Sequence, residues 1–522
     1  MSSTASRNSA RRLSIALGLA VCGVLACGGS SDRGTPATGG TGGTGGSAGT
    51  TGGGGAAGTS GAAGTGGDAA GVAGTSGSAG VAGTGGSAGT AGNGGATGNA
   101  GRGGNSAGSG GTGGMSGRGG TGGTGGATGS GGRGGGTAGS GGTGGGTQAW
   151  VGTWATGPQL TETSNNPPSP GLTNNTLRQV VFSSISGSQL RLRLSNEFGD
   201  GPVTINAVHI ALSTSGSSIT MSTDKAITFG GSAGVTIAQN QAVSSDPFDF
   251  ALPALTKVAI TIAFGSTPSG ITGHPGSRTT SYLVAGNMVG AASFSGAATA
   301  EHWYYIVGLD VMAPAGTAAV VTLGDSITDG RGSTTDMNNR WPDDFSRRLQ
   351  ANAPTLNKVA VLNQGIGGNA VLSGGLGPTA QARFMRDVLQ MRGVKWLIVF
   401  EGVNDLGGSS NGATTAQGLI TAYGSFVDMA HAMGIKAYGA TITPLGTSYY
   451  NADRDTGRNT VNTWIRTSSK FDAVIDLDMA VRNPADTSKM LSTYDSGDGL
   501  HPSVVGHQKM ADTVDLALFV NP

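Results

Sequence analysis

The chain has 522 residues, of which 102 are glycine, and its formal net charge is only +1. Charged residues make up 11% of the chain and no basic run stands out after the N-terminal leader, which argues against nucleic-acid binding. The two cysteines, Cys22 and Cys27, both lie near the N-terminus, so the remainder of the chain forms no intramolecular disulfide, cysteine metal site or thiol nucleophile.

Residues 1–27 are predicted to be a lipoprotein signal peptide. Arginines precede an apolar segment, 13–26, that is too short to span a membrane. The segment ends in Val24-Leu25-Ala26-Cys27, which resembles a bacterial lipobox, although Leu25 is larger than the usual residue there. We expect Cys27 to carry lipid and Gly28 to direct the protein to the outer membrane of a Gram-negative cell, with contact to the membrane only through this anchor. Cleavage without lipidation, and hence secretion, is the alternative.

Residues 28–147 consist mainly of Gly, Thr, Ser and Ala with few large apolar side chains. Such a segment cannot bury enough surface to offset the entropy lost on ordering, so we expect a disordered linker. A packed glycine-rich repeat is the alternative. The irregular triplets and the scarcity of proline argue against collagen-like order.

Residues 149–312 have the pattern of β-strands. The sequence from Leu190 to Leu194 alternates apolar and basic residues, and 203–212 and 257–264 are similar. Gly199-Asp200-Gly201 predicts a hairpin turn. The length suits one β-sandwich or jelly-roll accessory domain. Three tryptophans could stack on sugar rings or serve as core and interface anchors: Trp150, Trp154 and Trp303.

A short link at 312–316 leads into alternating strands and helices over 317–522. Strands are predicted near 318–323, 359–363, 396–400, 436–442 and 473–478. Helices are predicted near 342–351, 379–391, 414–433, 456–469 and 503–519. This alternation predicts an α/β domain with a parallel sheet and helices on both faces.

Four polar motifs follow the predicted strands or precede the last helix. They are Gly324-Asp325-Ser326-Ile327, Asn363 to Asn369, Gly402-Val403-Asn404-Asp405 and Asp498-Gly499-Leu500-His501-Pro502. The carboxyl ends of parallel strands meet at one edge of a sheet, where open α/β sheets bind their ligands. We therefore expect these motifs to converge on one site.

Ser326, His501 and Asp498 are the residue types of a nucleophilic triad. A serine hydroxyl needs a base within hydrogen-bond reach, and the base needs an orienting partner. His501 with Asp498 three residues earlier supplies both from one loop, whereas capping and packing is the alternative role. Asp325 is read as a structural hydrogen-bonding residue. A metal set of Asp498, His501 and His507 lacks a Glu or Cys as fourth ligand, so we expect no metal and no cofactor.

Together, the four motifs resemble those of the SGNH (GDSL-type) hydrolases over Thr317 to Pro522, with Ile327 where the name-giving motif has Leu. The resemblance implies a three-layer α/β/α, flavodoxin-like domain with an oxyanion hole. Its donors would be the backbone N–H groups of Ser326 and Gly368 and the side-chain amide of Asn404. Residues 325–342 and Trp150 to Trp154 resemble a subfamily of arylesterases and acylhydrolases found beside xylan-degrading enzymes.

That resemblance implies a serine esterase acting on short acyl groups such as acetyl, on plant polysaccharide or on aryl alcohols. A lipase, lysophospholipase or thioesterase of the same family is an alternative, although no long apolar insertion is visible beside the motifs. A surface carbohydrate-binding protein with an inert hydrolase fold is an alternative of another class. The four intact motifs disfavour it.

Overall fold

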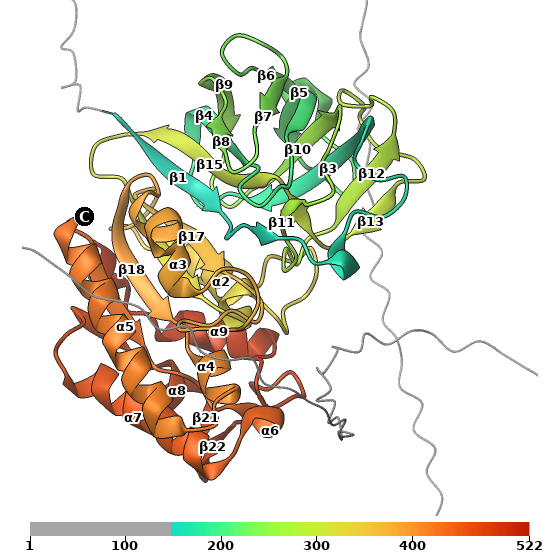
Figure 1. The fold of residues 1–522 in the computed structure, drawn as a ribbon. Coiled ribbons are helices and arrows are strands. Elements are labelled where there is room, and N and C mark those ends of the chain that lie inside the picture. The colour runs from blue at the N-terminus through green and yellow to red at the C-terminus, as the bar shows by residue number, and fades with distance from the viewer. Residues whose placement is uncertain (1–147, 521–522) are drawn as a thin grey trace, which may run out of the picture. The chain divides into compact units, whose positions relative to one another are not determined.

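The computed structural model describes residues 148–520. The predicted signal peptide, Cys27 and the whole of the predicted linker lie outside the described residues. Two regions follow one another along the chain, a β region up to Ala313 and an α/β region from Ala318 (Figure 1). Over the described residues, both regions belong to one compact unit.

The β region contains two larger antiparallel sheets and one small one. The first sheet has the order β1 (Ala149–Ala155), β15 (Ile306–Ala313), β4 (Gly187–Ser195) and β8 (Ala242–Ser244), with β9 (Phe248–Leu252) also on β4. The second has the order β13 (Ala298–Ala300), β12 (Ser281–Ala285), β3 (Asn175–Phe182), β10 (Lys257–Phe264), β5 (Val203–Leu212) and β6 (Lys225–Ile227), with β7 (Val235–Ile237) on β5. The small sheet joins β14 (Trp303–Tyr304), β11 (Thr272–His274) and β2 (Gln159–Leu160).

The alternation predicted for β4 is present, because its three leucines are buried and its two arginines are partly exposed. The hairpin predicted at Gly199-Asp200-Gly201 is wrong. β4 and β5 belong to different sheets, so this turn carries the chain from one sheet to the other. A turn motif reports a local reversal of direction, but it does not determine which strands pair.

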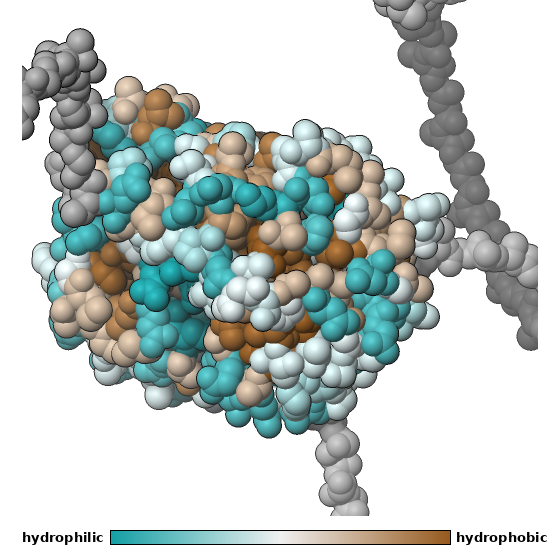
Figure 2. Space-filling view, turned by 90° about the horizontal axis from the view of Figure 1, so that it is seen from above, coloured by the Kyte–Doolittle hydropathy of each residue, from teal (hydrophilic) through white to brown (hydrophobic). Residues whose placement is uncertain are grey.

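On the face shown in Figure 2, polar side chains break up the apolar patches.

The α/β region is built on a five-stranded sheet in which all neighbours are parallel. Its order is β17 (Val359–Gly365), β16 (Ala318–Gly324), β18 (Val394–Phe400), β19 (Lys436–Ala440) and β20 (Ala473–Ile475). The predicted α/β fold with a parallel sheet is therefore confirmed. The spatial order 2-1-3-4-5 is that of flavodoxin-like sheets, which bind ligands where the strand order reverses.

The longer helices pack in pairs. α2 (Trp341–Ala351) packs on α9 (Val504–Thr513), and α5 (Gly412–Ala432) lies along α7 (Ala452–Thr467) (Figure 1). Because parallel crossovers are right-handed, the connections either side of the order reversal place their helices on opposite faces. The shorter elements are α1 (Ser326–Asp329), α3 (Ala380–Phe384), η3 (Met385–Leu389), α4 (Val403–Gly407), α6 (Gly446–Tyr449), α8 (Leu477–Val481), β21 (Arg482–Asn483), β22 (Asp486–Met490) and η4 (Leu516–Phe519), with the 3-10 turns η1 (Thr163–Asn165) and η2 (Met221–Thr223) in the β region.

One hydrophobic core runs through both regions. Trp154 and Trp303 are buried in it, with ring centroids 5.0 Å apart in an edge-to-face contact, so these two are core anchors. Trp150 is only partly buried, and the Arg191 guanidinium lies 4.4 Å from its ring centroid. Among residues 148–520, no helix combines the length and the apolar character needed to cross a membrane.

Candidate active site

The register of the parallel sheet brings three of the predicted motifs to one edge. Gly324 at the end of β16 pairs with Gly365 of β17 and with Phe400 of β18. The segments that follow these residues therefore leave the sheet side by side. The fourth motif, Asp498 to Pro502, reaches the same edge from the chain that leads into α9.

Asp325 fixes the turn that presents Ser326. Its carboxylate oxygen Oδ1 accepts a hydrogen bond of 2.9 Å from the Ile327 N–H, so Asp325 caps α1 and Ser326 is the first residue of that helix. The predicted structural role of Asp325 agrees with this contact. Burial, with repulsion from Asp405 and Asp329, raises the pKa of Asp325 to about 7.

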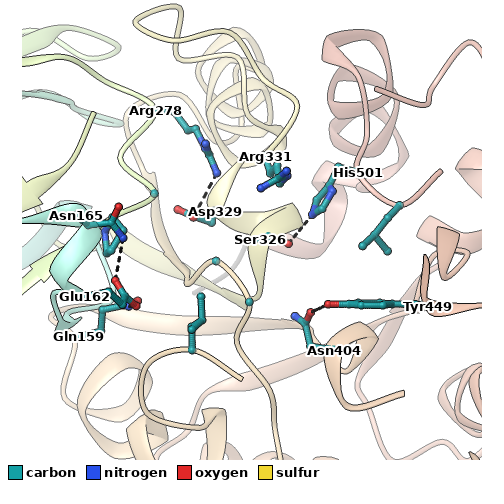
Figure 3. Close-up of a pocket in the computed structure, with 16 residues that line it drawn as sticks. Gln159, Glu162, Asn165, Arg278, Ser326, Asp329, Arg331, Asn404, Tyr449 and His501 are labelled. Carbon is teal, nitrogen blue, oxygen red and sulfur yellow. Dashed lines mark hydrogen bonds and ion pairs between the residues drawn. The ribbon is translucent and has the colours of Figure 1, made fainter. Parts of the chain in front are cut away.

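Ser326, His501 and Asp498 form a continuous hydrogen-bonded chain. Ser326 Oγ lies 2.8 Å from His501 Nε2, and His501 Nδ1 lies 2.6 Å from Asp498 Oδ2 (Figure 3). Because the carboxylate can only accept, Nδ1 carries the proton and Nε2 presents its lone pair to the serine hydroxyl. Asp498 Oδ1 also accepts from the backbone N–H groups of Leu500 and His501. The loop that bears the base is thus held by the same carboxylate that orients the ring.

The environment keeps the His501 ring neutral and its partner ionised. Burial lowers the pKa of His501, the contact with Asp498 opposes this, and the positive charges of Arg331 and Arg278 lower the pKa further. Partial burial works against ionisation of Asp498, but the hydrogen bonds from His501 and Leu500 leave its pKa below the ordinary value. This arrangement suits a neutral general base at neutral pH.

Ser326, Gly368 and Asn404 line the same cavity, and each has an N–H group available as a donor. Neither the Ser326 nor the Gly368 backbone N–H donates a hydrogen bond to another group within residues 148–520. Gly368 has φ +69°, a left-handed conformation, and a Cβ here would lie 3.0 Å from Leu376 Cδ1. Glycine therefore allows a turn that a larger residue would strain. Asn404 Nδ2 donates to Asn369 O at 2.7 Å, which leaves the second amide hydrogen for a ligand.

Tyr449 and Asp405 hold the Asn404 segment in place. The Tyr449 hydroxyl lies 3.1 Å from Asn404 Oδ1, and donation in this direction identifies the amide oxygen and turns Nδ2 toward the cavity. Asp405 accepts from the N–H groups of Val371 and Leu372 at 2.8 and 2.9 Å. This carboxylate therefore ties the Asn404 segment to the loop after β17.

His507 takes a structural position beside this site. Its Nε2 donates to Arg331 O at 3.1 Å, and its Nδ1 accepts from the Trp341 N–H at 3.2 Å. Burial lowers the pKa of His507 to about 4. Both ring nitrogens are thus committed to backbone groups. Within residues 148–520, no group of three or more His, Cys, Asp or Glu side chains has a metal-binding arrangement.

A cavity of about 270 Å³ opens over Ser326, and both regions of the chain line it. The side of the α/β region includes Ser326, Arg331, Asn404 and His501 (Figure 3). The opposite wall comes from the β region: Gln159, Glu162, Asn165, Pro275, Gly276 and Arg278. Most of the side chains of this wall are polar.

A buried pair joins the two regions beside the cavity. His274 Nε2 lies 2.9 Å from Asp329 Oδ1, and His274 Nδ1 lies 2.9 Å from Gly157 O. Since a carbonyl only accepts, Nδ1 carries a proton, and a second proton must lie between Nε2 and Asp329. The pair is then neutral overall. A Cβ at Gly276 would lie 1.7 Å from Asp329 Oδ2, so only glycine permits this approach.

Acidic side chains lie beneath the motif loops, around the buried guanidinium of Arg383. Arg383 donates to Asn369 Oδ1 at 3.0 Å and to Gly324 O at 3.0 Å, which links two of the motifs. Glu401 Oε1 lies 4.0 Å from Arg383 Nη2. Burial raises the pKa of Glu401 well above its ordinary value, and the charge of Asp325 adds to this.

A family model for the GDSL-like lipase/acylhydrolase family matches residues 322–509, which contain all of the motifs described above. This part of the chain belongs to that family. The enzyme class of this part of the chain is carboxylic ester hydrolase, as the sequence resemblance implied. A search of curated proteins finds no match.

Several solved structures are similar to 38% of the chain. They include a catalytic mutant of an acetylxylan esterase from Geobacillus stearothermophilus (20% identity, 38% of this chain and 93% of that chain, TM-score 0.29). A lipase/acylhydrolase from Enterococcus faecalis (23%, 38% and 93%, TM-score 0.28) and a GDSL-like lipase from Bacteroides thetaiotaomicron (19%, 38% and 87%, TM-score 0.28) also match. At these TM-scores we draw no functional conclusion from them.

Several side chains of the acylhydrolase site were not predicted from the sequence. Asp329 and Arg331 lie within the stretch that carries the family resemblance, so their nearness to Ser326 was a usable signal. Tyr449 comes from α6, a single turn without a motif. His274 lies in the β region, outside the four motifs, and the structure places it in the pair with Asp329 at the cavity wall.

Proposed function

We propose that this protein is an exported serine esterase that hydrolyses short-chain carboxylic esters through an acyl-enzyme. The observation that carries the proposal is the chain from Ser326 Oγ to His501 and Asp498, next to two backbone N–H groups without partners within residues 148–520. A serine with its base, an orienting carboxylate and oxyanion donors is the arrangement required for acyl transfer.

In the first half-reaction, Ser326 Oγ attacks the ester carbonyl while His501 Nε2 takes the hydroxyl proton. The carbonyl oxygen becomes an oxyanion, which the N–H groups of Ser326 and Gly368 and the amide of Asn404 stabilise. His501 then returns the proton to the departing alkoxide, so the alcohol leaves and an acyl-serine remains. Water attacks this ester by the same route and releases the carboxylic acid. Asp498 keeps its negative charge throughout and stabilises the imidazolium.

We further propose that the acyl group is short, such as acetyl, and that the alcohol is a polysaccharide or an aryl alcohol. The modest cavity and its polar wall from the β region support this reading over a lipase or a lysophospholipase, which would require an apolar acyl tunnel. We also propose that the two larger antiparallel sheets form a jelly-roll-like sandwich that serves as an accessory domain, with the acylhydrolase region as a three-layer α/β/α domain.

The test is covalent labelling and turnover in matched variants. Wild type should react with a fluorophosphonate and hydrolyse 4-nitrophenyl acetate, and Ser326→Ala should lose both by several orders of magnitude while it keeps its circular dichroism spectrum. Ser410→Ala, at an exposed serine outside the cavity, is the control. His501→Ala should lose comparable activity and Asp498→Asn somewhat less. Near-wild-type turnover by Ser326→Ala would exclude the proposed nucleophile.

Localisation is a separate proposal. The lipobox-like sequence before Cys27 supports a lipid-anchored protein with residues 28–147 as the tether. A lipidated cysteine carries enough methylene groups for stable attachment to a membrane. In cell fractionation, the wild type should partition with the outer membrane and Cys27→Ser should not. Recovery of both in the soluble secreted fraction would show that the protein is released.

A further inference from the structure

Two arginine side chains without hydrogen-bond partners face the cavity beside Ser326. Arg278 comes from the β region and Arg331 from the loop after α1, and both line the cavity (Figure 3). Within residues 148–520, neither guanidinium makes a hydrogen bond, and the ion pair of Arg278 Nη2 with Asp329 Oδ2 is long, at 4.0 Å. Arg278 Nε is buried and unpaired. The Arg331 side chain is exposed and that of Arg278 is 29% exposed, so water solvates these groups in the free protein, and a ligand that enters the cavity meets two cationic donors without hydrogen-bond partners in the described part of the chain.

Hydrogen bonds fix the backbone of both arginine-bearing loops beside the cavity. Arg278 has φ +50°, a left-handed conformation that a non-glycine residue adopts at a cost, as is common in ligand-binding sites. Its carbonyl accepts from the Asp336 N–H at 3.0 Å, and Asp336 in turn accepts from the Thr280 N–H and hydroxyl, both at 2.7 Å. Arg331 donates from its backbone N–H to Ser326 O at 2.8 Å. Asp336 thus fastens the two arginine-bearing loops to each other.

The remaining charges of the cavity favour a single negative charge in the ligand. The pair of His274 and Asp329 is neutral overall, so it does not cancel the two guanidinium charges. Glu162 is the other carboxylate of the lining, and its oxygens already accept from Gln159 and Asn165 at 2.6 and 3.0 Å. A planar guanidinium matches a carboxylate with two parallel hydrogen bonds. A dianion such as phosphate would meet about twice the repulsion from Glu162 that a monocarboxylate meets.

We propose that Arg278 and Arg331 form a carboxylate-binding subsite, and that the preferred ester carries a carboxylate close to the scissile bond. This inference rests on the proposed esterase function and specifies its substrate class. The carboxylate can belong to the acyl group or to the alcohol. The β region would thereby contribute directly to substrate specificity.

Paired esters test the proposal from both sides of the scissile bond. For the acyl side, mono-4-nitrophenyl adipate is compared with its methyl ester. For the alcohol side, 4-acetoxybenzoate is compared with methyl 4-acetoxybenzoate. The measured quantity is the ratio of kcat/KM for the acid to kcat/KM for the methyl ester. Loss of folded enzyme cancels within this ratio, because both esters are hydrolysed by the same preparation. The difference in intrinsic reactivity between the two esters cancels when the ratio of a variant is compared with that of wild type.

In Arg278→Gln, the acid-to-methyl-ester ratio of at least one ester pair should fall by roughly 10- to 100-fold. The substrate carboxylate stays charged, but the guanidinium that would pair with it is gone. Arg331→Gln should lower the same ratio, and Arg278→Lys should restore part of it. Arg392→Gln removes the same charge from an exposed position outside the cavity, and it should leave both ratios within about twofold of wild type.

The possible failures are distinguishable. Wild type that hydrolyses none of the four esters would contradict the proposed esterase function and not this subsite alone. Hydrolysis of the methyl esters with both ratios unchanged in Arg278→Gln and Arg331→Gln would overturn the subsite and leave the esterase intact. The ester pair whose ratio falls identifies the side of the scissile bond that carries the carboxylate.

Discussion

Replacing Glu401 with glutamine should stabilise the folded protein, and the gain should grow with pH. The Glu401 side chain is fully buried, and neither carboxyl oxygen has a hydrogen-bond partner within residues 148–520. Because its pKa is raised well above 4.5, the folded state keeps a proton that the unfolded chain releases. Stability conferred by this group is therefore present at low pH and falls as the pH rises above 4.5. Deprotonation of this group in the unfolded chain lowers the free energy of unfolding by at most about 1.4 kcal/mol per pH unit.

Glutamine does not titrate, so the free energy of unfolding of the variant lacks the pH dependence that Glu401 contributes. Urea unfolding of wild type and Glu401→Gln at about pH 5 and about pH 6 should show a stability difference that grows by up to about 1.4 kcal/mol. Other titrating groups largely cancel in the difference between the two proteins. Glu301→Gln, at an exposed position, is the control and should show no such growth. A pH-independent difference, or a variant that is less stable throughout, would refute the reasoning, because Glu401 would then be ionised in the fold.

Two further predictions concern activity. Tyr449→Phe should lower kcat by up to about tenfold with little change in KM, because Asn404 keeps its place but loses the hydroxyl that orients its amide; an unchanged kcat would exclude this positioning role. The acid limb of kcat/KM should have its midpoint below pH 6.5, since His501 must be neutral and its pKa is lowered. Arg331→Gln removes a positive charge near the ring, so it should move that midpoint to higher pH; a shift to lower pH would contradict the assignment.

The local features of the α/β region could be predicted from the sequence. Apolar runs such as 318–323 and 359–363 are buried strands, and the motifs after them lie together because parallel strands end at one edge. The last helix begins after a residue type that favours helix N-caps, since the Ser503 hydroxyl accepts from the Gly506 N–H at 3.2 Å. The short helices α1 and α4 escaped prediction because four or five residues are too few to show a helical period.

The wall of the site could not be predicted, because it depends on tertiary contact between distant segments. Arg278 reaches the cavity only through the packing of the β region on the α/β region, and nothing in its immediate sequence points to Ser326. The error at Gly199-Asp200-Gly201 has the same origin. The turn itself is local, whereas the sheets to which β4 and β5 belong depend on partners far along the chain.

Because the two regions share one core and one cavity, the acylhydrolase region cannot be separated from the β region as an independent domain. Hydrogen bonds join the two regions: the Gly152 N–H of β1 donates to Arg392 O at 3.1 Å, and the Val361 N–H of β17 donates to Ser184 Oγ, in the segment after β3, at 3.2 Å. A fragment that began at 317 would expose apolar surface at β17 and would lose one side of its binding cavity. Grafting a β region from a relative would therefore change the substrate preference and the folding of the enzyme together, so the two properties would have to evolve in concert.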